Sequence, residues 1–267
     1  MPALSADLTG WMLNGNVTWR MSIDYNGHGR SDSDWFPSSS GTTLPLTSTW
    51  NISFGPSLRG GTATLSYRYN SSTWKYFTFT IGGTNPSETN AKTKLGSSPW
   101  FLTRLARQES SLLQFSGSAP LAHDDPGGSV GFGLMMITNP PATSEHIWNW
   151  HANVEEGKSR VDAKESALTS PWNGYKQAWE LYNTQHQGQE VPAPGPEDQA
   201  NCHFVWNGGL AGSESTKSLR DAAWIKRYNG IPNGHDNVMW DGAQNQWAWW
   251  REANGSNYVN LVCSKAP

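Results

Sequence analysis

The chain has 267 residues, enough for one large domain or two of ordinary size. Its hydrophobic content of 36% and its 27 glycines are typical of a turn-rich globular protein and exclude a disordered one. A formal net charge of −3 argues against a nucleic-acid-binding protein.

The first ninety residues have the alternating pattern of short strands. Hydrophobic side chains recur at every second position in three runs, which are separated by clusters of Gly, Asn, Ser and Pro. The runs are Trp19, Met21, Ile23 and Tyr25, then Ala63, Leu65, Tyr67 and Tyr69, then Phe77, Phe79 and Ile81. Such alternation between turns predicts a small antiparallel, sandwich-like β module over residues 1–90.

The pattern changes to a helical period after a polar connection at residues 82–97. Ser98 and Pro99 predict a helix start, with a hydroxyl cap before a proline at the first helical position. Further helices are predicted at 150–168, 172–185 and 218–230. We therefore predict an α+β multidomain chain, in which the β-rich accessory module at 1–90 precedes a mainly α domain at 95–267.

Glu109 lies on the hydrophobic face of the first predicted helix. It follows Leu105 by four positions and precedes Leu112 by three, so the three side chains share one face. Burial disfavours the charged carboxylate, so we expect the pKa of Glu109 to be raised, as a general acid near neutral pH requires. The alternative interpretation is a glutamate at the edge of this face that pairs with Arg104 or Arg107.

Three segments resemble motifs of the lytic transglycosylases and goose-type lysozymes. The stretch Ala106–Ser111, with the sequence Ala-Arg-Gln-Glu-Ser-Ser, resembles the family's catalytic Glu-Ser motif. The stretch Gly131–Ile137, Gly-Phe-Gly-Leu-Met-Met-Ile, is similar to its Gly-Leu-Met-Gln segment. The stretch Lys226–Gly230, Lys-Arg-Tyr-Asn-Gly, resembles its Tyr-Asn-Gly motif. The order of the motifs agrees with the family over residues 95–263.

The resemblance implies a lysozyme-like, mainly α fold, in which a glutamate at the end of a helix protonates the leaving oxygen of a β-1,4 glycosidic bond. It assigns this role to Glu109, and it implies that Tyr228 reaches toward Glu109 and orients it. It further implies that Gly133, Leu134 and Met135 form a cleft wall whose backbone groups hold the sugar. The residues expected to bind substrate are Ser110, Gly133, Leu134, Met135, Met136, Thr138 and Asn229.

Two departures from the family's pattern bear on the reaction. Met136 stands where the family has Gln, and Thr138 stands where goose-type lysozymes have an aspartate. Hydrolysis with inversion needs a second carboxylate to activate water, and the nearby acids are Asp124 and Asp125, which a solvated turn would equally explain. Without such a base, Glu109 would act as acid and then as base on the sugar's 6-hydroxyl, which gives a 1,6-anhydro product.

The resemblance therefore implies a peptidoglycan-degrading enzyme that cleaves the β-1,4 bond between N-acetylmuramic acid and N-acetylglucosamine, in the first place as a lytic transglycosylase. A hydrolytic muramidase and a chitinase on the same fold are alternatives within this class. A non-catalytic glycan-binding protein is the alternative from another class. The sixteen tryptophans fit each of these, because indole rings fill cores and also stack on sugar rings.

Other features bear on cofactors, compartment and partners. Because no metal-ligand spacing or phosphate-binding loop occurs, we expect no metal or other cofactor. No stretch is apolar for long enough to span a bilayer, and Met1–Thr9 lacks the pattern of a secretory signal. We expect an extracellular or periplasmic monomer that binds the glycan strands of peptidoglycan. It would be phage-encoded, delivered by contact, or exported with a signal peptide that has been removed. In that compartment Cys202 and Cys263 would form a disulfide, the alternative being two buried thiols.

Overall fold

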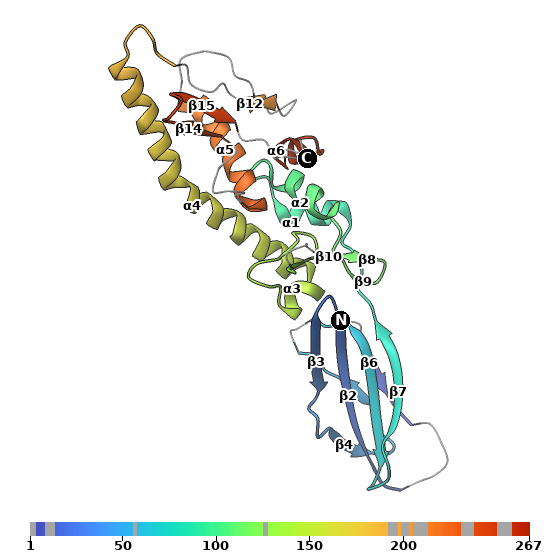
Figure 1. Cartoon of the computed structure of the whole chain (residues 1–267). Coiled ribbons are helices and arrows are strands. Elements are labelled where there is room, and N and C mark those ends of the chain that lie inside the picture. The colour runs from blue at the N-terminus through green and yellow to red at the C-terminus, as the bar shows by residue number, and fades with distance from the viewer. Residues whose placement is uncertain are drawn as a thin grey trace. The chain divides into compact units, whose positions relative to one another are not determined.

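The computed structural model describes residues 4–8, 14–55, 58–124, 128–191, 197–198, 203–204, 213–230, 238–249 and 258–267 (Figure 1). Helices and antiparallel sheets both contribute, which confirms the predicted α+β class. The chain forms two compact units, of which one comprises Met1–Ser87 with Leu113–Asn153 and the other Glu88–Leu112 with Val154–Pro267. Each unit is thus built from two separate stretches of the sequence.

The first unit contains a five-stranded antiparallel sheet that is formed around the long strand β2. Its order is β3-β2-β6-β7, and β4 pairs with the start of β2. The strands are β2 (Asn16–Gly27), β3 (Arg30–Phe36), β4 (Thr42–Pro45), β6 (Gly61–Tyr69) and β7 (Lys75–Ile81). A separate pair consists of β1 (Leu4–Ala6) and β5 (Trp50–Ile52). The three predicted alternating runs lie on β2, β6 and β7, as the sequence indicated.

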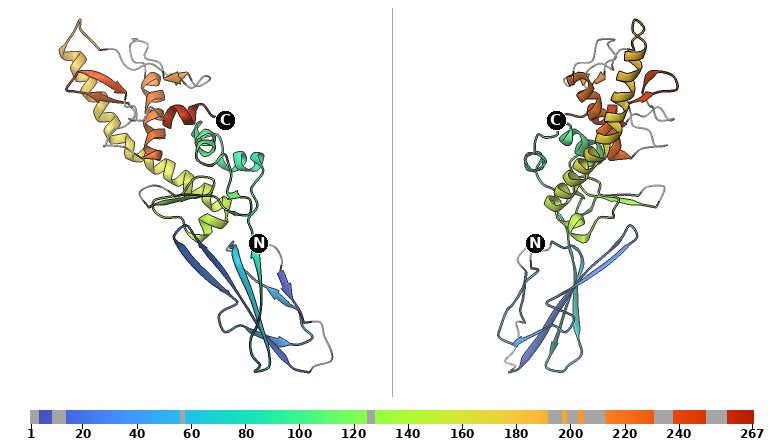
Figure 2. Two further views of the ribbon diagram at one scale, coloured as in Figure 1. Left: turned by 45° about the vertical axis from the view of Figure 1, so that its right-hand side comes forward. Right: turned by 90° about the vertical axis from the view of Figure 1, so that its left-hand side faces the viewer.

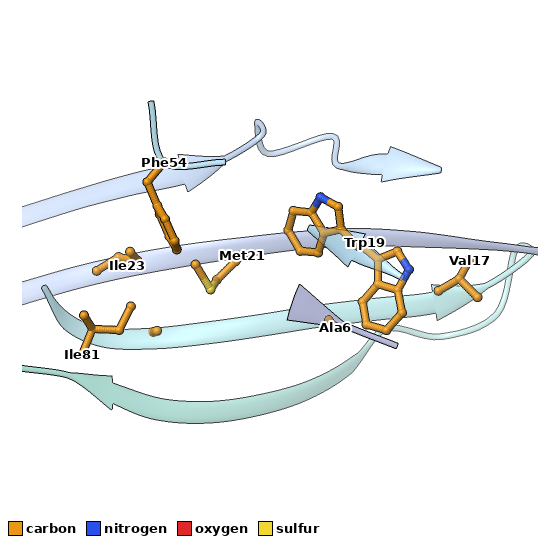
Figure 3. Packing of buried hydrophobic residues seen from close by; sticks show 9 residues of the cluster. Ala6, Val17, Trp19, Met21, Ile23, Phe54 and Ile81 are labelled. Atoms are coloured by element: carbon orange, nitrogen blue, oxygen red, sulfur yellow. The ribbon is translucent and has the colours of Figure 1, made fainter. Parts of the chain in front are cut away.

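One face of the five-stranded sheet carries the hydrophobic core of the β module (Figure 3). Trp19, Met21 and Ile23 of β2 are buried there, because alternate residues of a strand point to the same side. Trp50 of β5 joins them, with its ring stacked on that of Trp19 at 6.2 Å between centroids, and so does Phe54. The burial of these large rings is a main source of the module's stability.

The loop-rich segment 113–153 belongs to the same unit as the β module, which differs from the predicted division near residue 90. Its elements are β8 (Phe115–Ser116), β9 (Ala119–Pro120), β10 (Ala122–Asp124), β11 (Val130–Phe132) and α3 (Ser144–Trp148). Arg30 of β3 donates a hydrogen bond to the carbonyl oxygen of Ala142 at 2.6 Å, and Arg59 pairs with Glu145 at 3.2 Å. The ring of Trp148 packs edge-on against Tyr25. Contacts between partners so distant in sequence leave no periodic signal, so sequence alone did not reveal this grouping.

The second unit is mainly helical. Its helices are α1 (Glu88–Leu95), α2 (Leu102–Ser110), most of α4 (Trp150–Gln185), α5 (Ser213–Asn229) and α6 (Tyr258–Cys263). Its strand pairs are β12 (Glu197–Asp198) with β13 (His203–Phe204) and β14 (Val238–Asp241) with β15 (Gln246–Trp249). Within the described part of the chain, no helix has the length and apolar character needed to cross a bilayer.

The sequence predicted two helices where the structure has the single helix α4, seen as one continuous ribbon in Figure 2. Pro171 lies inside it, although a proline removes one backbone hydrogen bond and usually ends a helix. Leu168, Trp172 and Trp179 are buried along this stretch, and Trp172 and Trp179 both contact the ring of Trp247 on β15. We attribute the continuity of α4 to this packing, which outweighs the local preference of the sequence.

Helix α2 also differs from its predicted limits. It begins at Leu102 rather than at Pro99, because Phe101 forms a turn and is fully buried edge-on against Trp224 of α5. It ends at Ser110, and both Ser111 and Leu112 have left-handed backbone conformations. The prediction that Leu112 continues the helical face of Leu105 is therefore wrong, although both side chains are buried.

Candidate functional site

Glu109 lies in the last turn of α2 and is half-buried. The phenolic hydroxyl of Tyr258, the first residue of α6, donates a hydrogen bond to Oε1 of Glu109. Tyr258 is buried, so this donor approaches the carboxyl group from the interior of the unit. Glu109 thus occupies the kind of position that the family resemblance gives its glutamate, near the end of a helix, and Tyr258 holds its carboxyl group there.

Tyr228 of α5 is the second phenol in this site, and Glu109 acts on it electrostatically. Burial raises the pKa of Tyr228 above the usual 10.0, and the negative charge of Glu109 raises it further. Burial likewise raises the pKa of Tyr258 well above 10.0, and the charge of Glu109, the hydrogen bond to it and Tyr228 contribute further. Both hydroxyls are therefore protonated near neutral pH, and that of Tyr258 donates to Glu109.

Arg104 of α2 fixes the end of α6. Its Nη1 donates to the carbonyl oxygens of Cys263 at 2.7 Å and Lys265 at 2.9 Å. A cation at these last carbonyls stabilises the C-terminus of a helix, so Arg104 positions the helix that carries Tyr258. Arg107 pairs with Glu88 of α1. The two arginines that sequence offered as partners of Glu109 thus have these other partners.

Tyr228 is half-buried near the end of α5. The indole Nε1 of Trp224 donates to the carbonyl oxygen of Val161 on α4 at 2.6 Å, which anchors α5 one turn before Tyr228. Lys226 is fully buried, and its Nζ lies 3.4 Å from Oδ1 of Asn229. Asn229 is the exposed last residue of α5, and its predicted role in binding substrate stays a prediction.

The raised tyrosine pKa values predict that the protein loses stability in alkali. Above pH 10 the unfolded chain releases the protons of Tyr228 and Tyr258 while the folded chain keeps them. The free energy of unfolding should then fall by about 1.4 kcal/mol per pH unit for each of the two phenols. Urea unfolding at pH 9, 10 and 11 measures this slope. Tyr258→Phe removes one phenol and should flatten the slope, and an identical slope in the variant would contradict the explanation.

The predicted sugar-binding segment Gly131–Ile137 folds as a tight turn in the first unit. Its ends form an antiparallel bridge between Phe132 and Ile137. Gly133 has a left-handed φ of 74°, and an added Cβ would lie 2.5 Å from side-chain atoms of Gln114 and Asn153. Only glycine fits this position without displacing both amides.

Gln114 and Asn153 are two fully buried amides that hold this turn. Oε1 of Gln114 accepts a hydrogen bond from the N–H of Leu134 at 3.0 Å, and Oδ1 of Asn153 accepts one from Met135 at 2.8 Å. The N–H of Gly133 donates to the carbonyl oxygen of Leu121 at 2.9 Å. These three backbone N–H groups therefore bond within the protein, and the expectation that backbone groups of this segment hold a sugar stays a prediction.

The remaining predicted substrate contacts also have internal partners. Leu134 and Met135 are fully buried, whereas Met136 and Thr138 are half-buried. Oγ1 of Thr138 donates to the carbonyl oxygen of Met136 at 2.9 Å. In the other unit, the buried Oγ of Ser110 donates to the carbonyl oxygen of Ala106 at 3.1 Å. Their roles in substrate binding stay predictions.

The candidate second carboxylate Asp124 ends strand β10. Its Oδ1 lies 3.1 Å from Nδ1 of His28, and 64% of its side chain is exposed. The pair suits a solvated turn and also a carboxylate that could activate water, so the structure leaves both interpretations of Asp124 in place. Asp125 lies outside the described residues.

Of the two cysteines in the predicted disulfide, Cys202 lies outside the described residues. Cys263 is buried in the last turn of α6. Among the described residues, no group of three or more His, Cys, Asp or Glu side chains is placed to hold a metal ion.

Sequence reasoning missed Tyr258, Gln114 and Asn153. Tyr258 begins the apolar run at the end of the chain, which indicated only packing. Gln114 and Asn153 have no motif around them, and only the fold shows that they meet at Gly133. No protein-family model matches the chain, and neither a curated protein nor a solved structure matches it. The geometry of these residues therefore has to support any assignment.

Proposed function

We propose that the chain cleaves the β-1,4 bond between N-acetylmuramic acid and N-acetylglucosamine in peptidoglycan, with Glu109 as acid and base on a lysozyme-like helical domain. The observation that carries the proposal is the half-buried carboxyl group of Glu109 at the end of α2, bonded to Tyr258 and beside Tyr228. These contacts of the carboxyl group support the proposal in addition to the resemblance of the three motifs.

In the proposed reaction, Glu109 donates its proton to the glycosidic oxygen as the bond to the muramic acid carbon breaks. The substrate's own N-acetyl oxygen stabilises the cationic sugar. The Glu109 carboxylate then takes the proton of the 6-hydroxyl group, whose oxygen bonds to the same carbon. The product is a 1,6-anhydro sugar, no water is consumed, and Glu109 regains its proton.

Tyr258 supports both steps of this reaction. A buried phenol that donates to Oε1 restrains the rotation of the carboxyl group, so that proton transfer starts from one geometry. Because burial keeps the phenol protonated, it remains a donor while Glu109 is charged. Tyr258 is thus a positioning residue in this proposal.

A hydrolytic muramidase is the second candidate, and the observation that favours it is the exposed carboxylate of Asp124. As a base it would activate a water molecule, and the product would carry a reducing end. In either reaction the enzyme would act outside the cytoplasm on glycan strands of the cell wall.

Mass spectrometry of digested, purified peptidoglycan tests the proposal. Muropeptides with 1,6-anhydro ends are the expected products. Products with reducing ends would instead show that the enzyme is a hydrolytic muramidase. Release of sugars from purified chitin alone would indicate a chitinase, and no release from either polymer would favour a non-catalytic glycan-binding protein.

A further inference from the structure

The face of the five-stranded sheet that points away from its core has an unusual composition. Register pairs Ser22 with both Trp35 and Thr64, and it aligns Arg20, Ser66 and Tyr76 across β2, β6 and β7. Side chains opposite one another in an antiparallel sheet lie on the same face. This surface, called the polar face, comprises Thr18, Arg20, Ser22, Asp24, Ser33, Trp35, Thr62, Thr64, Ser66, Arg68, Trp74, Tyr76, Thr78 and Thr80.

Aromatic rings and guanidinium groups alternate along the polar face. The guanidinium carbon of Arg20 lies 4.9 Å from the ring centroid of Trp35 and 4.1 Å from that of Trp74. That of Arg68 lies 4.8 Å from the Trp74 ring. These cation–π contacts hold the rings in place, so they offer fixed rather than mobile surfaces to a ligand.

Two aromatic side chains of the polar face remain accessible. Trp35 on β3 is 39% exposed, and Tyr76 on β7 is 62% exposed. β3 and β7 are separated by three strand spacings, so the strands that carry the two rings lie about 14 Å apart across the sheet. A ligand that contacts both must be an extended chain rather than a single sugar or a small metabolite.

The composition of the polar face selects the chemistry of this ligand. It holds no aliphatic side chain. Thr18, Ser22 and Ser66 are buried, whereas the exposed hydroxyl groups of Ser33, Thr62, Thr78 and Thr80 can exchange hydrogen bonds with sugar hydroxyls. Aromatic rings stack on the sugar faces. The polar face carries two arginines, Arg20 and Arg68, and one acidic residue, Asp24, so its net positive charge favours a ligand that carries carboxylates.

We propose that the polar face of the β module binds the carboxylate-bearing glycan strands of peptidoglycan. The identity of this polymer rests on the proposed function. Sugar rings stack on Trp35 and Tyr76, and a carboxylate of the strand pairs with Arg68. The module holds the enzyme on its substrate independently of Glu109.

Binding of the full chain to purified peptidoglycan tests this proposal. In a Glu109→Gln background, which would leave the polymer intact, co-sedimentation gives the dissociation constant. Tyr76→Ala and Trp35→Ala should each weaken binding by roughly 3- to 10-fold. Phe77→Ala is the matched control, because Phe77 is also 62% exposed but lies on the opposite side of β7, and it should change binding less than 2-fold by the same reasoning.

Equal binding of the Tyr76→Ala, Trp35→Ala and Phe77→Ala proteins would overturn the proposal. Binding to neutral chitin as tight as to peptidoglycan would overturn the role of the carboxylates. With Glu109 intact, Tyr76→Ala should cleave short soluble glycan fragments like the parent. Loss of binding with cleavage retained therefore tests the polar face, whereas absence of cleavage in the parent would contradict the proposed function alone.

Discussion

Glu109→Gln should reduce the release of muropeptides from peptidoglycan at least about 1,000-fold, because the group that donates a proton in the first step and accepts one in the second is lost. Glutamine has nearly the shape of glutamate, and its carbonyl oxygen can still accept the hydrogen bond from Tyr258. The variant should therefore fold normally, with a melting temperature close to that of the parent. Release of muropeptides from purified wall, followed by chromatography, measures the effect.

Glu88→Gln is the matched control for this experiment. Glu88 begins α1 in the same unit, is exposed, and pairs with Lys92 and Arg107. The side-chain hydrogen bond from Lys92, followed by that from Arg107, lowers the pKa of Glu88, so it is ionised near neutral pH and cannot serve as a proton donor. The control should keep full activity. More than a tenth of the parent's activity in Glu109→Gln would contradict the assignment of Glu109.

The strands of the β module could be predicted because their signal is local. A strand with one buried face repeats every second residue, and β2 shows this alternation over several residues in its own sequence. The ends of the helices were harder to predict from the sequence. Phe101 is held in a turn by Trp224, and Pro171 is kept within α4 by aromatic packing, so partners far along the chain determine both outcomes.

The candidate site likewise has one residue that a local pattern predicts and others that only the fold brings together. Glu109 was identified from a short motif on one helix, and its place in the last turn of α2 is a local property. Tyr258 donates to it from 149 positions away, and the sequence around Tyr258 indicates no more than a hydrophobic helix. The environment of a carboxyl group is a tertiary property, which explains why sequence indicated Glu109 but only one of the two phenols beside it.

Gly133→Ala should destabilise the first unit by roughly 3 to 8 kcal/mol. A left-handed backbone costs a residue with a Cβ about 1–2 kcal/mol. The new methyl group would also displace the buried amides of Gln114 and Asn153, which hold Leu134 and Met135, and each disrupted buried hydrogen bond costs about 1–3 kcal/mol. Urea unfolding followed by tryptophan fluorescence measures the change in the free energy of unfolding.

Gly117→Ala separates the two contributions, since Gly117 also has a left-handed φ, of 62°, but an added Cβ would meet no atom within 4 Å. Its cost should be only the backbone term of about 1–2 kcal/mol. The difference between the two losses in the free energy of unfolding then measures the cost of displacing the amides of Gln114 and Asn153. Equal destabilisation would show that Gln114 and Asn153 move away from the methyl group without losing their hydrogen bonds. That result would contradict the claim that the packing of these two amides requires glycine at position 133.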